Sequence, residues 1–384
     1  MHLFATLACM ERSITYRILS YTLILAVFVV APVWPDSDLP VGEASSLSVS
    51  EHDGYIHVEV LTPWPGADTT FEYALVDRTR DDHNEEQVPE GLSVIRTPVE
   101  RVVTMSTTFV AGFEELGELD RIVGHDNPDF LYSEAARRRA SAGDLAAVAP
   151  GNEIDLEVLI DLQPDLVMVN QYDPADDTVD RIEEAGLTVL VSGDWTEHSP
   201  VGRMEWIYLT GLLTGTAERA AEYAGETAAR YEHLADSVSD VDYRPEVLIN
   251  GPFQGTWAVP EADAYSARFI EDAGGDYPWS DESGTGSLFL DVEAVFDRAG
   301  NADIWINPGQ WQSLDDIADE RLFEFEPVNA GRVYNNNRRI SESGGIDYFE
   351  SGQIRPDDIL ADLISIFHPD TRPDHELIYY QRLD

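Results

Sequence analysis

TAERAAEYAGETAARYEHLADSV, residues 216–238, is the longest stretch of this chain that follows one helical period. Small or apolar residues recur every three or four positions, the spacing of a helix with one buried stripe. They are Ala217, Ala220, Ala221, Ala224, Ala228, Tyr231, Leu234, Ala235 and Val238. Such a helix is about 34 Å long, roughly the breadth of a small domain. We interpret it as a rigid helix joining two lobes; an ordinary surface helix within one larger domain is the alternative.

Strands alternate with helices on both sides of this helix, which predicts mostly parallel sheets covered by helices. Short hydrophobic strands are expected before it at 101–105, 122–124, 166–169 and 188–191, and after it at 246–250, 304–307 and 332–335. Each half also places an Asp-x-Glu at a helix start, Asp155-Leu156-Glu157 and Asp291-Val292-Glu293. We therefore predict an α/β fold of two related lobes joined by one long helix.

The N-terminal residues have a different character. Arg12 and Arg17 precede Ile18–Trp34, an uncharged and mostly apolar run that is typical of an export signal or a short membrane anchor. We favour a retained anchor because no A-x-A cleavage site follows; a buried core helix is the alternative. Two alternating stretches, 55–61 and 70–76, predict a β-hairpin that packs against the first lobe.

These patterns divide the chain into five parts. We expect a signal or anchor segment at 1–35, a linker at 36–50, an N-terminal lobe with its hairpin at 51–213, the linking helix at 214–240 and a C-terminal lobe at 241–384. The protein is then exported, held at the membrane by its N-terminus, and otherwise extracellular. We expect a monomer.

The charge of the chain is extreme. Its 384 residues include 73 Asp and Glu against 24 basic residues, all of them Arg, which gives a net charge of -49. This charge repels nucleic acid and excludes it as a partner. Scattered carboxylates on a chain that is 43% hydrophobic resemble the surfaces of proteins from extreme halophiles. Molar salt shortens the screening length to about 3 Å, so we expect stability to fall at low salt.

The residues that usually carry chemistry form no catalytic pattern. Cys9 is the only cysteine, and the nine histidines form no H-x-x-x-H or H-E-x-x-H spacing, so a histidine metal site could assemble only from distant positions. No nucleophile or phosphate-loop signature occurs. We expect no catalytic residues, no bound metal and no resident cofactor, and therefore no enzyme.

Three motifs carry a resemblance to a known family. PVERVVTMSTT at 98–108, LGELDRIVG at 116–124 and LEVLIDLQPDLV at 156–167 resemble the substrate-binding proteins of iron–siderophore, haem and cobalamin ABC importers. The resemblance spans about residues 92–369 and is specific in the order of its motifs. It implies two α/β lobes on one long helix, a ligand in the cleft between them, and delivery to a permease dimer with its ATPase subunits.

The ligand class stays open between a siderophore, haem and cobalamin. Two functions of other classes also stay open. One is an extracellular enzyme on the same bilobal scaffold that acts on a cofactor-like ligand. The other is a sensor whose anchor passes a signal inward.

Ligands of such folds bind beyond the carboxyl ends of the parallel strands, so loops at those ends supply the candidate ligand-binding residues. Aromatic walls with a few polar or cationic groups suit a large planar chelate. The candidates are Ser106, Thr107, Phe130, Tyr132, Tyr172, Trp195, Arg203, Phe253, Trp257, Trp279, Trp311, Arg338 and Arg339. Packing is the alternative role for each aromatic, and a salt bridge for each arginine; Arg203 could instead clamp Glu205.

Two exposed acids are candidates for another surface. Glu157 and Glu293 match the family positions that dock on basic residues of the permease, one from each lobe. Their alternative role is to stabilise the positive end of a helix.

Overall fold

The computed structural model describes residues 39–80, 85–151, 153–173 and 175–384. The predicted signal or anchor segment and the start of the predicted linker lie outside these residues. Within the described part of the chain, no helix is both long enough and apolar enough to cross a membrane.

A four-stranded sheet contains the predicted hairpin. Its strands lie in chain order and are β1 (Leu47–His52), β2 (Tyr55–Val60), β3 (Phe71–Asp77) and β4 (Ser93–Thr97). The hairpin prediction is confirmed in β2 and β3, which pair antiparallel. The sheet is larger than the prediction because β1 forms inside the region read as a linker and β4 adds a parallel strand. It packs on the first lobe, where the Tyr73 hydroxyl accepts the Val191 N–H at 2.8 Å.

The first lobe is built on a five-stranded parallel sheet in the order β7-β6-β5-β8-β9. Its strands are β5 (Val102–Thr104), β6 (Ile122–His125), β7 (Ala146–Ala147), β8 (Leu166–Asn170) and β9 (Val189–Ser192). Every residue of β8 and β9 is buried, as expected for strands covered on both faces. Its helices are α1 (Val110–Glu115), α2 (Glu134–Ala142), α3 (Leu156–Asp161) and α4 (Thr178–Glu184).

The second lobe repeats the parallel arrangement on a smaller scale. In its main sheet β10 (Val247–Ile249), β14 (Ile304–Ile306) and β15 (Val333–Asn335) run parallel, and β16 (Gln381–Arg382) is antiparallel at the edge. A separate antiparallel sheet holds β11 (Pro252–Phe253), β12 (Thr256–Pro260) and β13 (Ser287–Leu290). Its helices are α8 (Tyr265–Asp272), α9 (Val292–Ala299), α10 (Glu326–Asn329) and α11 (Pro356–Phe367).

Three consecutive helices connect the lobes: α5 (Pro200–Glu205), α6 (Ile207–Thr214) and α7 (Ala217–Asp236). All eight residues of α6 are buried, so it shows no amphipathic period and was not predicted. The predicted long helix is α7, with 20 residues and a buried stripe of Ala217, Ala220, Ala224, Thr227 and Tyr231.

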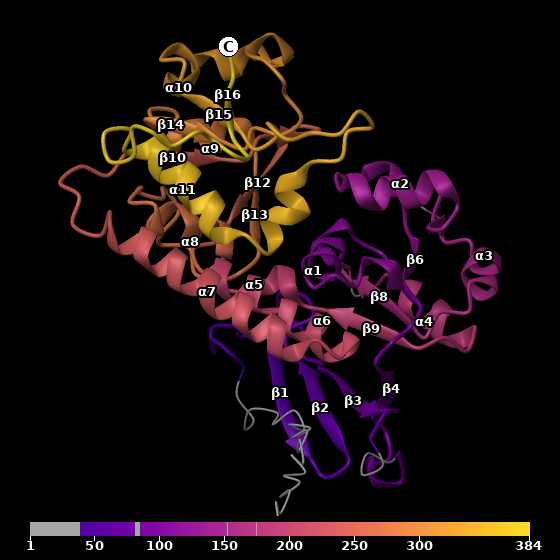
Figure 1. Ribbon diagram of the computed structural model, residues 1–384. Helices are drawn as coiled ribbons and strands as arrows, with labels where there is room; N and C mark the ends of the chain where they lie inside the picture. Colours follow the sequence, from indigo (N-terminus) through magenta and orange to yellow (C-terminus); the bar gives the residue numbers. More distant parts are fainter. Residues whose placement is uncertain (1–38, 81–84, 152, 174) are drawn as a thin grey trace, which may run out of the picture. The chain divides into compact units, whose positions relative to one another are not determined.

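The two halves of α7 pack on different lobes (Figure 1). In the first half, Arg219 donates to the carbonyl oxygens of Leu116 at 3.1 Å and Glu115 at 2.6 Å. In the second half, Arg230 binds Asp357 of α11 at 2.6 Å and the Tyr231 hydroxyl donates to Asp272 of α8 at 2.9 Å. One straight helix therefore contacts both lobes, as the sequence predicts.

Buried carboxylates hold both ends of the described chain in place. Glu205 of α5 is fully buried and accepts four consecutive backbone N–H groups, from residues 41–44, at 2.6–2.9 Å. Asp362 of α11 is also fully buried and accepts the N–H groups of residues 378–380 together with the His375 ring. The Glu205 carboxylate thus accepts backbone N–H groups and does not pair with Arg203.

Gly225 tests the packing of α7. It lies in the exposed middle of the helix, with nothing within 4 Å of the position that a Cβ would take. We expect Gly225→Ala to stabilise the protein by about 1 kcal/mol, because alanine loses less backbone entropy in a helix. Denaturant unfolding in molar KCl measures the change.

Gly143→Ala is the matched control. This C-cap glycine of α2 also has nothing within 4 Å of a Cβ, but its φ of 83° disfavours any side chain. The same substitution should therefore destabilise here. If both variants shift the unfolding free energy in the same direction, the helix propensity of residue 225 does not explain the effect of Gly225→Ala.

Candidate functional site

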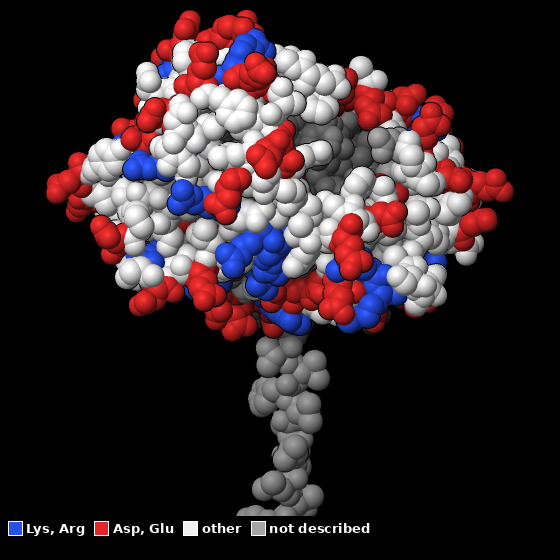
Figure 2. All heavy atoms as spheres, turned by 90° about the horizontal axis from the view of Figure 1, so that it is seen from above, with Lys and Arg blue, Asp and Glu red and all other residues white. Residues whose placement is uncertain are grey.

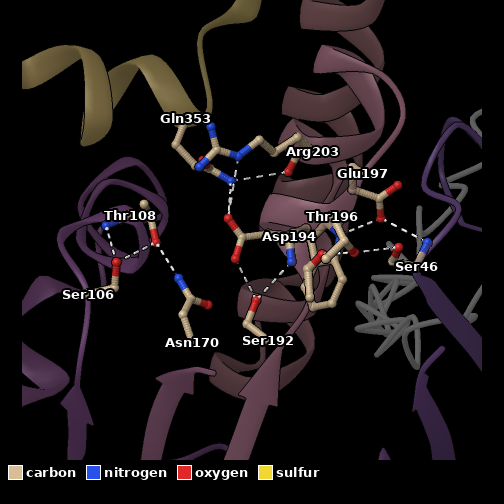
Figure 3. A network of polar contacts seen from close by, with 12 residues as sticks. Ser46, Ser106, Thr108, Asn170, Ser192, Asp194, Thr196, Glu197, Arg203 and Gln353 are labelled. Carbon is tan, nitrogen blue, oxygen red and sulfur yellow. Dashed lines mark hydrogen bonds and ion pairs between the residues drawn. The ribbon is translucent and has the colours of Figure 1, made fainter. Parts of the chain in front are cut away.

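Polar side chains gather where β5, β8 and β9 end (Figure 3). Ser106 follows β5, and its hydroxyl lies 2.9 Å from the hydroxyl of Thr108. The Asn170 amide at the end of β8 donates to Thr108 Oγ1 at 3.4 Å and to the Tyr172 hydroxyl at 3.4 Å. These residues meet because parallel strands bring their carboxyl ends to one edge of a sheet.

Asp194, just after β9, links this edge to the second lobe (Figure 3). One carboxylate oxygen accepts the Ser192 hydroxyl at 2.8 Å, and the other accepts the Gln353 side-chain amide at 2.9 Å. Arg203 of α5 places its Nε 3.5 Å from the same carboxylate and stacks its guanidinium 4.4 Å from the ring centre of Tyr265. Arg203 is therefore a cation built into the joint between the lobes.

Four side-chain atoms at this joint are buried and have no hydrogen-bond partner among the described residues. They are Oδ1 of Asn170, Nε1 of Trp195, Nε of Arg203 and Oε1 of Gln353. A buried polar atom left unpaired costs about 1–3 kcal/mol, so such groups are usual at functional sites. They offer two acceptors and two donors.

The joint itself is tightly packed. The cavity beside Arg203 and Gln353 has a volume of about 30 Å³, which is room for a water molecule and not for an organic ligand. A much larger cleft, about 400 Å³, lies between α1 and the start of α2 on one side and residues 339–355 on the other. Its volume falls in the range of small-molecule sites.

Charged side chains dominate the lining of this larger cleft. Five carboxylates and three arginines line it: Glu114, Glu115, Glu134, Asp347, Glu350, Arg137, Arg339 and Arg355. The guanidinium of Arg339 binds Asp347 at 2.9 Å and lies 5.2 Å from the ring centre of Tyr132. Acidic side chains also outnumber basic ones across the face shown in Figure 2, which carries a hollow. The cleft is thus more acidic than basic.

Glu350 crosses between the lobes beside this cleft. Its carboxylate, 2% exposed, accepts the backbone N–H groups of Tyr132 at 2.7 Å and Ser133 at 2.8 Å. Burial raises the pKa of Glu350 from 4.5 to about 7, with Asp347 and Glu114 adding to the rise and the two N–H groups opposing it. The carboxyl group therefore titrates near neutral pH.

Several predicted aromatic residues are open to solvent at the strand ends. Phe130 is 51% exposed, Tyr172 62% and Phe253 76%. Trp195 is half-buried against Tyr172, with the ring centres 5.1 Å apart. Exposed patches of large apolar rings are common at binding surfaces.

Two predicted residues lie elsewhere. Trp257 is fully buried on β12, stacks 5.3 Å from Trp305, and donates its indole N–H to the Ile249 carbonyl at 3.0 Å. Trp279 is 1% exposed and packs beside Tyr277. Both belong to the core of the second lobe and do not reach an open cleft, because each ring is enclosed by its own lobe.

The remaining predicted residues have mixed surroundings. Ser106, Thr107, Tyr132 and Arg339 are half-buried, and Tyr132 and Arg339 line the larger cleft. Trp311 is half-buried and packs against Trp305, with the ring centres 5.3 Å apart. Arg338 is exposed. Sequence reasoning missed Glu350, which lies between two short 3-10 helices, and Gln353, the last residue of the second; this segment has no hydrophobic periodicity.

The two proposed docking glutamates occupy equivalent places. Glu157 is exposed in the first turn of α3, where the Asp155 side chain caps the Val158 N–H at 3.1 Å. Glu293 is in the first turn of α9, where Asp291 caps the Ala294 N–H at 2.8 Å. The Glu293 carboxylate forms a salt bridge with the guanidinium of Arg321.

Comparison with known proteins identifies the family. The model of the periplasmic binding protein family matches residues 102–337, more than half of the chain. The chain belongs to this family. An uncharacterised lipoprotein of Methanocaldococcus jannaschii is 25% identical to this periplasmic binding protein over 300 residues, 74% of this chain and 69% of the relative.

Two further comparisons concern binding proteins with named ligands. A cobalamin-binding protein of Halobacterium salinarum is 30% identical over 189 residues, 49% of this chain and 48% of the relative. The structure of a periplasmic haem-binding protein from Pseudomonas aeruginosa has a TM-score of 0.53 at 18% identity, over 74% of this chain and 98% of that one. The second likeness is one of fold: two α/β lobes with parallel sheets.

We predict a pH signature for Glu350. The folded state binds its proton more tightly than the unfolded chain does, so its contribution to stability is full below pH 4.5 and is lost as the pH rises to about 7. Glu350→Gln keeps the shape and removes the titration. The unfolding free energy of the wild type should therefore fall relative to this variant across that window.

Denaturant unfolding at a series of pH values in molar KCl measures this difference. Glu134→Gln is the control, since it makes the same change in an exposed carboxylate of the same cleft. If the difference in unfolding free energy between the wild type and Glu350→Gln does not change with pH, as for Glu134→Gln, the burial of Glu350 has no effect on its titration.

Proposed function

We propose that this protein is the extracellular substrate-binding protein of an ABC importer that captures an iron chelate or a related tetrapyrrole. The observation that carries the proposal is the interlobe cleft of about 400 Å³, in a member of the periplasmic binding protein family. Exposed aromatic rings at the carboxyl ends of the strands support it, because they can stack on a large planar ligand.

Among these ligands, a corrinoid such as cobalamin has the best support. The cleft is lined by five carboxylates and three arginines, a poor match for the carboxylates of haem or of many siderophores. Arg203 is held by Asp194 and Tyr265, and Arg339 by Asp347, so neither is a free cation for an anionic ligand. The resemblance to a cobalamin-binding protein points the same way.

The N-terminal apolar run indicates where the protein acts. We propose that the apolar run 18–34 tethers the protein to the outer side of the membrane, in keeping with the lipoprotein of M. jannaschii that it resembles. The acidic surface fits a medium of high salt, where its self-repulsion is screened.

Ligand titration tests this function. In molar KCl, tryptophan emission should be quenched by cobalamin with a Kd of about 1 μM or tighter, equivalent to about -8 kcal/mol. Tyr172→Ala removes an exposed ring beside Trp195 and should weaken binding about tenfold, the effect of losing one aromatic anchor. Fluorescence titration and calorimetry measure both effects.

Tyr243→Ala is the matched control. Tyr243 is 59% exposed, close to the 62% of Tyr172, but precedes β10 at the amino end of the second sheet. Affinity should not change in this variant. Haemin and a panel of ferric siderophores are titrated in parallel; tighter binding of one of them would replace cobalamin as the ligand, and no binding by any would contradict the transport function.

We also propose that Glu157 and Glu293 dock the loaded protein on a two-fold permease. Replacing both with Arg should abolish uptake and leave ligand affinity unchanged, because each is at a helix start outside the larger cleft. At molar salt only contact-range pairs remain effective, so the loss reflects direct pairing.

Uptake by cells and calorimetry on the soluble protein separate these two effects. Glu222→Arg with Glu232→Arg is the control, since it makes the same charge change on the exposed face of α7. Uptake that survives the Glu157 and Glu293 replacements, or that is lost equally in the control, would rule out this docking pair.

A further inference from the structure

The outer face of the N-terminal sheet brings three metal-ligating side chains together. His57 and Glu59 are two residues apart on β2 and point to the same face, while Glu72 lies on β3 directly opposite Glu59. One ligand atom from each lies within 4.8 Å of the other two. The shortest contact joins His57 Nε2 and a Glu72 carboxylate oxygen at 3.0 Å.

The register of the strands makes this arrangement costly without a cation. Like charges that face each other directly across two strands repel, and Glu59 faces Glu72 in the centre of the sheet. The neighbours of His57 across the sheet are Ser50 and Ala74, both small, and the His57 side chain keeps 16% of its surface exposed.

We propose that His57, Glu59 and Glu72 form a binding site for a divalent transition-metal ion. One imidazole nitrogen with two carboxylate oxygens is a donor set for Zn²⁺ or a similar ion, since Mg²⁺ and Ca²⁺ favour oxygen ligands alone. Tetrahedral Zn²⁺ with bonds near 2.0 Å separates its ligand atoms by about 3.3 Å, and the three ligand atoms here already lie within 4.8 Å of one another.

Neighbouring groups complete the surroundings of the ion. The Ser48 hydroxyl donates to Glu59 at 3.0 Å and holds that carboxylate in position, as outer-shell partners of metal ligands do. The ring centre of His52 lies 5.8 Å from that of His57, but its Nε2 is 3.1 Å from the Ser50 hydroxyl and outside the three-residue group. This site is separate from the interlobe cleft and does not rest on the proposed transport function.

The bound ion would tie β2 to β3 and so stabilise the sheet that packs on the first lobe. Calorimetric titration of the full-length protein with Zn²⁺ in molar KCl tests the site, with a large excess of Mg²⁺ present to occupy the general acidic surface. We expect one Zn²⁺ per chain and a rise in melting temperature on Zn²⁺ addition.

Four variants locate the ion. His57→Gln and Glu72→Gln should each weaken Zn²⁺ binding by at least about tenfold, the loss expected when a metal site is disturbed. His233→Gln on exposed α7 and Glu51→Gln on the neighbouring strand β1 are the controls and should bind as the wild type does.

Two results would overturn the proposal. One is Zn²⁺ binding that Mg²⁺ abolishes, which would mean attraction to surface carboxylates alone. The other is binding that His57→Gln and Glu72→Gln leave unchanged. X-ray absorption of the Zn²⁺-loaded wild type provides a test that needs no variant: a shell without an imidazole nitrogen contradicts the site.

Discussion

A buried carboxylate that accepts backbone N–H groups is the interaction on which this structure depends. Glu205 takes four such groups, Asp362 takes three, and Glu350 takes two. In a chain with 73 acidic and 24 basic residues, most carboxylates have no cation to pair with. Backbone donors satisfy a buried carboxylate without a second ion and therefore avoid the cost of burying two charges.

These contacts have a structural role because they join segments far apart in the sequence. Glu205 fixes residues 41–44 on α5, Asp362 fixes residues 378–380 on α11, and Glu350 joins one lobe to the other. The long helix α7 adds a further connection, since its two halves pack on different lobes. The cleft itself lies between α1 with the start of α2 and residues 339–355, and Glu350 joins its two sides.

The fold could be predicted from the sequence where it depends on periodicity. The stripe of α7 and the alternation of short strands with helices appear in the residues, and the structure confirms both. Helix α6 could not be found this way, because a helix buried on all sides has no apolar stripe. The link between Arg203 and Asp194 was hidden as well, since the nearer acid in sequence, Glu205, binds the backbone instead.

The site was less predictable than the fold. An aromatic residue near a strand end can turn into the core or towards solvent: Trp257 turns inward, whereas Tyr172 turns outward, and no local pattern distinguishes them. Glu350 lies between two short 3-10 helices and Gln353 ends the second, and their side-chain contacts with the first lobe arise only when the lobes meet. The metal-ligating set on β2 and β3 depends in the same way on strand register, because Glu72 is remote from His57 in sequence.

The contact of Glu350 with the N–H groups of residues 132 and 133 has an evolutionary consequence. Every non-proline residue supplies the same N–H group, so the joint between the lobes survives most substitutions at these two positions. Tyr132, whose side chain lines the cleft, can then vary while its backbone continues to hold the lobes together. The lining of the cleft and the attachment of the lobes can thus change independently at one residue.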